Sequence, residues 1–176
     1  MKIIKITKQI IKCFNEPLYL KTILINKRLK LYSFKNKNRK IDLSNFDRSI
    51  KVNLGCGLKV AEGWINIDYN LHSLYSEKNY SLNKINKLYD YLKQINYSEL
   101  NRPYRFSLSK NDFIQILDNN IFICHNLLFG IPFSDNSIDY FYSSHMIGFS
   151  FPKNDSIFVL NEVFRKLKPG GKIRLS

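Results

Sequence analysis

The chain has 176 residues, 28 Lys and Arg against 14 Asp and Glu, a net charge of +14, and 44% hydrophobic residues. This length suffices for one domain with a hydrophobic core and is too short for two. The positive charge alone would suit nucleic acid or an anionic membrane, but the lysines are scattered, which favours a compositional origin. Three widely spaced cysteines and three scattered histidines form neither a disulfide framework nor a metal motif, which favours a reducing, cytoplasmic setting.

The N-terminal part of the chain is predicted to be helical. Residues 1–14 carry isoleucines and lysines on separate faces of an amphipathic helix. We expect its apolar face to pack on its own domain, and weak contact with an anionic membrane is the alternative. A second helix is predicted over 20–31, and a polar linker over 33–47. Residues 1–47 are thus interpreted as an N-terminal helical extension and linker, and 48–176 as an α/β domain.

No stretch approaches the ~18 consecutive apolar residues of a transmembrane helix, so no membrane span is expected. The basic N-terminus also lacks the pattern of a signal peptide.

The most informative stretch is a glycine turn between two predicted strands. A short strand with Val52 and Leu54 ends in the turn 55–57, Gly-Cys-Gly, and a second strand over 64–67 ends at Asp68. Glycines at such a turn permit positive φ and let a ligand approach the backbone. A carboxylate after the next strand can accept both hydroxyls of a ribose. This pattern is typical of half a nucleotide-binding unit, and a plain tight turn is the alternative.

The spacing of this stretch argues against NAD. In dehydrogenases the acidic residue follows the glycines by roughly 20 residues, whereas Asp68 follows Gly57 by 11, and Val60 takes the place of a third glycine. The connection 58–63 leaves room for about one helical turn, whose backbone N–H groups would suit a carboxylate.

The second half of the chain continues the alternation of helices and strands. Residues 70–120 form an insertion with helices predicted over 82–95 and 112–117, interpreted either as a substrate cover or as an ornament on the sheet edge. Strands are predicted over 121–124 and 138–142. A last helix is expected to be capped by Asn154 or Asp155 and ended by 169–171, with a final strand from Lys172. Its expected apolar face consists of Ile157, Leu160, Val163, Phe164 and Leu167.

A series of blocks in this order resembles the class I S-adenosylmethionine-dependent methyltransferases, in the type 11-like subgroup. The blocks are Leu-Gly-Cys-Gly at 54–57, Gly-Trp-Ile-Asn-Ile-Asp at 63–68, Pro-Phe-Ser-Asp-Asn-Ser-Ile-Asp at 132–139, Ser-Ser-His at 143–145 and Leu-Lys-Pro-Gly-Gly at 167–171. The resemblance implies a Rossmann-like, doubly wound, mostly parallel sheet. A complete member has seven strands, so we expect a fold that is truncated after the fifth.

The resemblance also implies a donor site. Asn53, Gly55, Cys56 and Gly57 would form the turn under the amino-acid part of S-adenosylmethionine, Asp68 would hold the ribose, Asn126 and Leu127 the adenine, and Ser143 would lie beside the methionine portion.

Two departures from the subgroup concern this site. The subgroup usually has Asp where this chain has Asn126, although an amide oxygen can still accept from adenine. Residues 147–149, Ile-Gly-Phe, replace the usual Leu-Glu-His. His145 remains as the titratable candidate for a general base, but a packing role is preferred, so no catalytic residue is assigned.

The function that the resemblance implies is methyl transfer to a small molecule or glycan. A truncated or degenerate, non-catalytic relative that acts as a binding or structural partner is the alternative. A nucleic-acid-binding protein is a third hypothesis that rests on net charge alone, and we do not expect nucleic acid as a partner. The sequence assigns neither the acceptor atom nor the oligomeric state.

Overall fold

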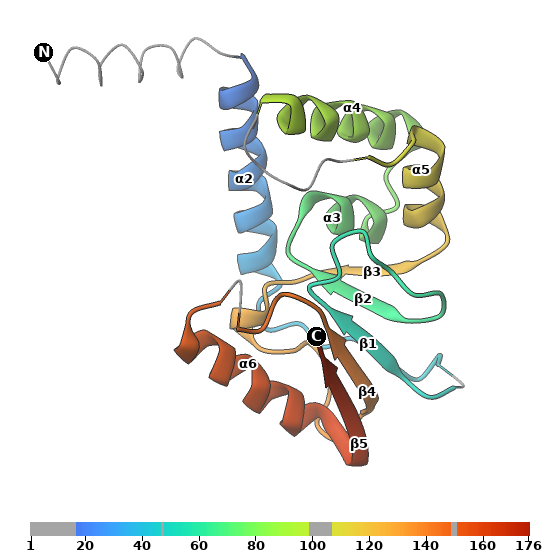
Figure 1. Cartoon of the computed structure of the whole chain (residues 1–176), viewed down its shortest axis with the longest axis vertical. Coiled ribbons are helices and arrows are strands. Elements are labelled where there is room, and N and C mark those ends of the chain that lie inside the picture. The colour runs from blue at the N-terminus through green and yellow to red at the C-terminus, as the bar shows by residue number, and fades with distance from the viewer. Residues whose placement is uncertain (1–16, 47, 99–106, 149–150) are drawn as a thin grey trace, which may run out of the picture.

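The computed structural model describes residues 17–46, 48–98, 107–148 and 151–176. It contains one five-stranded sheet in the order β3-β2-β1-β4-β5, and every neighbouring pair is parallel. The strands are β1 (Lys51–Leu54), β2 (Ile65–Asp68), β3 (Ile121–Cys124), β4 (Ile138–Ser143) and β5 (Leu167–Leu175). The order reverses between β1 and β4, so the predicted Rossmann-like α/β fold is confirmed (Figure 1).

One face of the sheet carries most of the hydrophobic core. Val52 and Leu54 of β1 and Phe141 of β4 are fully buried, and they pack in one cluster with Val159 and Val163 of α6 (Lys153–Lys166). Short, nearly continuous apolar runs are what parallel strands covered by helices require.

The opposite face is covered only in part. Phe122 of β3 packs in a second cluster with residues of α4 (Leu82–Ser98) and α5 (Lys110–Asp118), while α3 (Leu71–Glu77) lies beside β3. Side chains of β1 and β4 on this face line an open cavity instead. Among the labelled elements of Figure 1, no helix lies over β1, β4 and β5 on the side opposite α6.

The N-terminal helix α2 (Pro17–Lys35) runs along the β3 side of the molecule. The predicted second helix is therefore confirmed and is longer than expected, and the linker begins after Lys35. Leu29 and Tyr32 pack with Leu74 of α3 and Cys124 of β3. The helix predicted over 1–14 lies outside the described residues.

The predicted helices of the insertion are confirmed as α4 and α5. Neither α3, α4 nor α5 contributes a residue to the cavity at the carboxyl ends of the strands. Their packing on β3 favours the interpretation as a sheet-edge ornament over that of a substrate cover.

The termini of α6 differ from the prediction. Pro152 takes the N-cap position without a side-chain cap, so neither Asn154 nor Asp155 caps the helix. The helix ends at Lys166 because β5 already begins at Leu167 and not at Lys172. Ile138 pairs with Leu167 but Tyr140 pairs with Lys172, so residues 168–171 form an irregularity within the strand pair.

The buried face of α6 also differs from the predicted one. Val163 and Leu167 are buried as expected, but Ile157 and Phe164 are 46% and 64% exposed. The helix instead buries positions at a spacing of three and four residues, Ser156, Val159, Val163 and Lys166.

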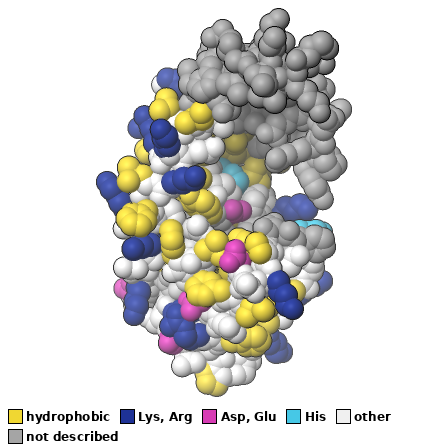
Figure 2. Space-filling model, turned by 90° about the vertical axis from the view of Figure 1, so that its left-hand side faces the viewer, with side chains coloured by type: hydrophobic (Ala, Val, Ile, Leu, Met, Phe, Trp, Pro, Cys, Tyr) yellow, Lys and Arg dark blue, Asp and Glu magenta, His cyan; other side chains and the backbone are white. Residues whose placement is uncertain are grey.

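The surface carries many cations. Figure 2 shows Lys and Arg side chains spread over the displayed face between hydrophobic ones, as their scatter along the sequence predicts. Within the part of the chain that the structure describes, no helix is long and apolar enough to cross a membrane.

Candidate functional site

A cavity of about 250 Å³ lies at the carboxyl ends of β1, β2, β3 and β4. Four of the eight residues predicted for the donor site line it, namely Gly55, Asp68, Asn126 and Leu127. Its other lining residues are Tyr69, His125, Ser144, His145, Met146 and Phe151. In an open parallel sheet, ligands bind at this end of the strands, beside the point where the strand order reverses. The structure therefore brings together, at the expected place, residues that are 72 positions apart in the sequence, as Gly55 and Leu127 are.

The other four predicted residues do not line this cavity. Asn53 points to the opposite face of the sheet, where its amide donates to the Lys59 carbonyl at 2.9 Å and to the Asn66 side chain at 3.3 Å. This hydrogen bond to Lys59 ties the connection 58–63 to β1. Cys56 and Ser143 are buried. Burial, and then the negative charge of Asp68, raises the pKa of the Cys56 thiol above its usual range, so this thiol is not a nucleophile.

Gly57 and Asp68 are joined within the glycine turn. The Gly57 N–H donates to Oδ2 of Asp68 at 2.6 Å, and the Gly57 carbonyl accepts from Nε2 of His72 at 2.8 Å. Burial lowers the pKa of His72, so its ring is neutral with the proton on Nε2. Oδ1 of Asp68 has no hydrogen bond among the described residues, and this oxygen is the one available to a ligand.

The helical turn predicted in the connection 58–63 is wrong. The described chain forms turns there without a helix. Ten residues separate Leu54 of β1 from Ile65 of β2, at the lower limit of the about 10–12 that a whole crossover needs, and 55–57 are already used by the glycine turn. The donor carboxylate therefore has no helix N-terminus at this place.

Asn126 begins the short helix η1 (Leu127–Phe129) after β3. Its side-chain oxygen accepts from the Leu128 N–H at 3.0 Å, which caps the helix. An amide oxygen has two lone pairs and the amide nitrogen two donors, so Asn126 keeps hydrogen-bonding capacity towards the cavity.

His125 is a lining residue that the sequence did not single out. It is 1% exposed, and its Nε2 donates to the Gly130 carbonyl at 2.9 Å, so Nδ1 is an acceptor. Nδ1 is buried without a hydrogen-bond partner among the described residues. Burial, and then the positive charge of Arg39, lowers the pKa of His125 to about 4. The neutral ring thus offers one acceptor nitrogen beside Asn126.

The end of β3 is fixed by an ion pair between Arg39 and Glu77. Arg39 donates to the Cys124 carbonyl at 2.8 Å, and the Cys124 N–H donates to Glu77 at 2.8 Å. The two charged side chains also contact each other and are only 16% and 19% exposed. The pair thus binds both the N–H and the carbonyl of Cys124, the residue before His125.

Met146 lies directly over the glycine turn. Gly55 has φ +65°, and a Cβ built there would come within 2.9 Å of Cβ and Cγ of Met146 and still closer to its Sδ. His145, the residue before Met146, also has a positive φ, and its Nδ1 lies 2.7 Å from the Ser144 hydroxyl. Met146 thus packs against Gly55, whereas a Cβ built at Gly57 would meet nothing within 4 Å. No motif in the sequence marks Met146, because its position follows from the fold of the loop.

A family model matches the second half of the chain. Residues 92–175 match the family model described as a methyltransferase domain, and this range contains β3, β4, α6 and β5. Among solved structures, the crystal structure of a SAM dependent methyltransferase from Aquifex aeolicus is 18% identical, with a TM-score of 0.36 over 85% of this chain and 70% of that chain. The comparison with curated proteins gave no match. The second half of this chain is thus similar to a methyltransferase domain, and the parallel α/β sheet agrees with the resemblance found in the sequence.

Proposed function

We propose that the chain uses S-adenosylmethionine to methylate a small molecule or glycan. The observation that carries this proposal is the cavity in which Gly55, Asp68, Asn126 and Leu127 meet at the carboxyl ends of four strands. The family match over residues 92–175 supports the reaction class.

The residues present suit the chemical groups of this donor. Oδ1 of Asp68 would accept from a ribose hydroxyl, since Oδ2 already holds the turn. Asn126 and Leu127 would lie at the adenine edge, whose amino group needs an acceptor such as the amide oxygen of Asn126. The sulfonium supplies an activated methyl group, and the chain's task is to hold acceptor and donor in line, so positioning carries most of the catalysis.

The experiment is calorimetric titration of the purified chain with S-adenosylmethionine and, separately, with NAD. We expect micromolar binding of the methyl donor, no binding of NAD, and at least about tenfold weaker binding by Asp68→Ala, since a hydrogen bond to a charged group contributes about 1.5–3 kcal/mol. Asp90→Ala, a change of an exposed carboxylate on α4, is the matched control and should bind as the parent does. A folded chain that binds neither compound refutes the proposal.

The alternative function is that of a non-catalytic relative. Two observations favour it: Met146 packs tightly against Gly55, and 250 Å³ is below the ~300–1,000 Å³ of typical ligand pockets. A non-catalytic relative predicts that the folded chain does not bind the donor even when Met146 is replaced by Ala. Binding by Met146→Ala but not by the parent would instead assign a gating role to this residue.

A further inference from the structure

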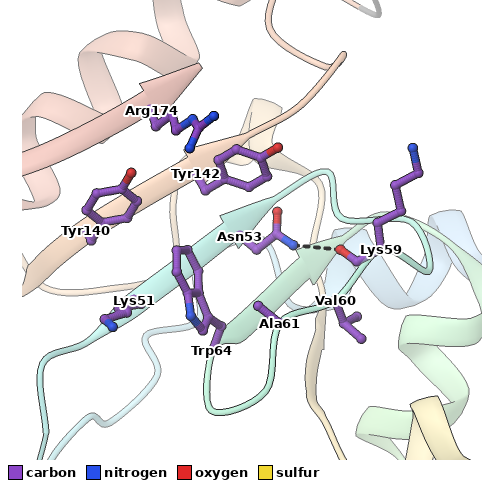
Figure 3. Close-up of a pocket in the computed structure, with 9 residues that line it drawn as sticks. All are labelled: Lys51, Asn53, Lys59, Val60, Ala61, Trp64, Tyr140, Tyr142 and Arg174. Atoms are coloured by element: carbon purple, nitrogen blue, oxygen red, sulfur yellow. Dashed lines mark hydrogen bonds between the residues drawn. The ribbon is translucent and has the colours of Figure 1, made fainter. Parts of the chain in front are cut away.

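A second cavity, of about 590 Å³, lies on the sheet face opposite α6 (Figure 3). It opens where no described helix covers β1, β4 and β5. It shares no lining residue with the cavity at the carboxyl ends of the strands. Its lining residues are Lys51, Asn53, Lys59, Val60, Ala61, Trp64, Tyr140, Tyr142 and Arg174.

Three aromatic rings form the centre of this site. Trp64 stands edge-to-face against Tyr140 at 5.5 Å and against Tyr142 at 6.5 Å between ring centroids. All three side chains are partly exposed, and the two tyrosines lie on the same face of β4 because they are two residues apart. A group of rings on an open sheet is a surface on which flat molecules can stack.

Cations flank these rings on the neighbouring strands. In the sheet register, Lys51 of β1 and Lys172 of β5 lie on either side of Tyr140, and Arg174 of β5 lies beside Tyr142. Nζ of Lys51 is 5.8 Å from the centroid of the Trp64 ring. No Asp or Glu is among the residues that line the cavity. The site is therefore built for a ligand that combines negative charge with ring faces.

We propose that this open sheet face binds single-stranded nucleic acid. Aromatic side chains that stack successive bases, with Lys and Arg along the path of the backbone, are the features by which proteins hold single strands. Cations stand on both sides of the rings, on β1 and β5, and each of these strands lies about 4.8 Å from β4. More than one phosphate of a strand could therefore contact a cation. A free mononucleotide brings its negative charge to only one side of a base.

Charge complementarity disfavours the chain's own N-terminus as the occupant. Residues 1–16, outside the described part, contain four Lys and one Glu, the same sign of charge as this face. In the sequence, nucleic acid binding rests on net charge alone, whereas the folded chain places aromatic rings and cations together on one face. It does not depend on methyl transfer, since the two cavities have separate linings.

Trp64 is the single tryptophan of the chain, so its fluorescence reports directly on this site. The test titrates the full chain with an oligouridylate of about ten nucleotides, a length within known site sizes. We expect saturable quenching that weakens steeply with salt. Absence of quenching together with absence of binding by anisotropy of a labelled oligonucleotide overturns the proposal. Titration with S-adenosylmethionine on the same preparation tests the proposed function separately.

Variants separate this site from the general positive charge. Lys172→Ala/Arg174→Ala removes two exposed cations of the face, and Lys27→Ala/Lys30→Ala removes two exposed cations of α2. The first should weaken binding at least about tenfold and lower the log–log salt slope by about 1.4, whereas the second should change affinity less than about twofold. Equal losses in both double variants would assign binding to net charge and overturn the proposal.

The contribution of the rings is tested with Tyr140→Ala, which should weaken binding at least about fivefold, the low end for loss of a stacked base. Circular dichroism of each variant confirms that it is folded. Polyphosphate and polyglutamate supply charge without bases, and uridine monophosphate supplies a single nucleotide. If any of these binds as tightly as the oligonucleotide with the same dependence on Tyr140, the face recognises another ligand and the proposal fails.

Discussion

Replacing Gly55 by Ala tests the packing of Met146 on the glycine turn. Gly55 has φ +65° and Gly63 has φ +74°, so an Ala at either position pays the cost of a left-handed conformation, about 1–2 kcal/mol. A Cβ at Gly63 meets nothing within 4 Å, whereas a Cβ at Gly55 comes within 2.9 Å of Cβ and Cγ of Met146. Overpacking of this kind costs typically about 1–3 kcal/mol more.

The expected loss of unfolding free energy is therefore about 3 kcal/mol for Gly55→Ala and about 1–2 kcal/mol for Gly63→Ala. Urea denaturation followed by circular dichroism measures both. In the double variant Gly55→Ala/Met146→Ala, Sδ and Cγ are removed but Cβ of residue 146 remains, so roughly half of the extra loss should be recovered. Equal losses at the two glycines, within about 0.5 kcal/mol, would refute the close packing of Met146 on the turn.

Two further predictions concern the end of β3. Glu77→Gln removes one charge of the ion pair that holds Cys124, and it should lower the unfolding free energy by about 2 kcal/mol. This loss is smaller than for a fully buried pair because both side chains are partly exposed. A double-mutant cycle with Arg39→Met measures the coupling energy of the pair, and a value near zero contradicts the assigned role. Burial lowers the pKa of His125 from 6.5 to about 4, so the unfolded chain takes up its proton first as the pH falls. The stability that His125 contributes is thus complete above pH 6.5 and is lost towards pH 4, by up to about 3 kcal/mol. His125→Gln should therefore flatten the pH dependence of the unfolding free energy in that window. His72 is present in both the variant and the parent, so the difference between them isolates His125. An unchanged slope would contradict the lowered pKa of His125.

The strands β1 to β4 were predictable because each is a short stretch with apolar residues bounded by turn residues, as around Val52 and Leu54 in β1. The start of β5 was not, because the Pro-Gly-Gly sequence at 169–171 indicates a turn within it. The face of the sheet to which the Asn53 side chain points was also predictable from the sequence. Between Val52 and Leu54, which face α6, a strand must point Asn53 to the other side of the sheet. The resemblance placed it in the donor turn because motif blocks give positions along the chain and not faces of the sheet.

The rotation of α6 was not predictable from its apolar residues. Val163 belongs to two possible stripes of helical spacing, one extended by Ile157 and Phe164 and the other by Val159. In the structure the second stripe packs in the core against β1 and β4. Lys166 extends this stripe, because it buries its stem and reaches Asp135, with 2.7 Å between Nζ and Oδ1. This contact is with a partner 31 residues away in the sequence, which a local pattern does not contain.

The short connection 58–63 links the two candidate sites. Because the glycine turn uses three of the ten residues between β1 and β2, the rest are too few for a crossover helix. The Gly57 N–H therefore bonds to Asp68 within the turn instead of standing at a helix N-terminus. For the same reason, no crossover helix between β1 and β2 covers the sheet beside Trp64 and Tyr142, and the second cavity stays open. A helix inserted into 58–63 should therefore close the open face and abolish oligonucleotide binding, while Oδ1 of Asp68 and the residues after β3 stay in place for the proposed methyl donor.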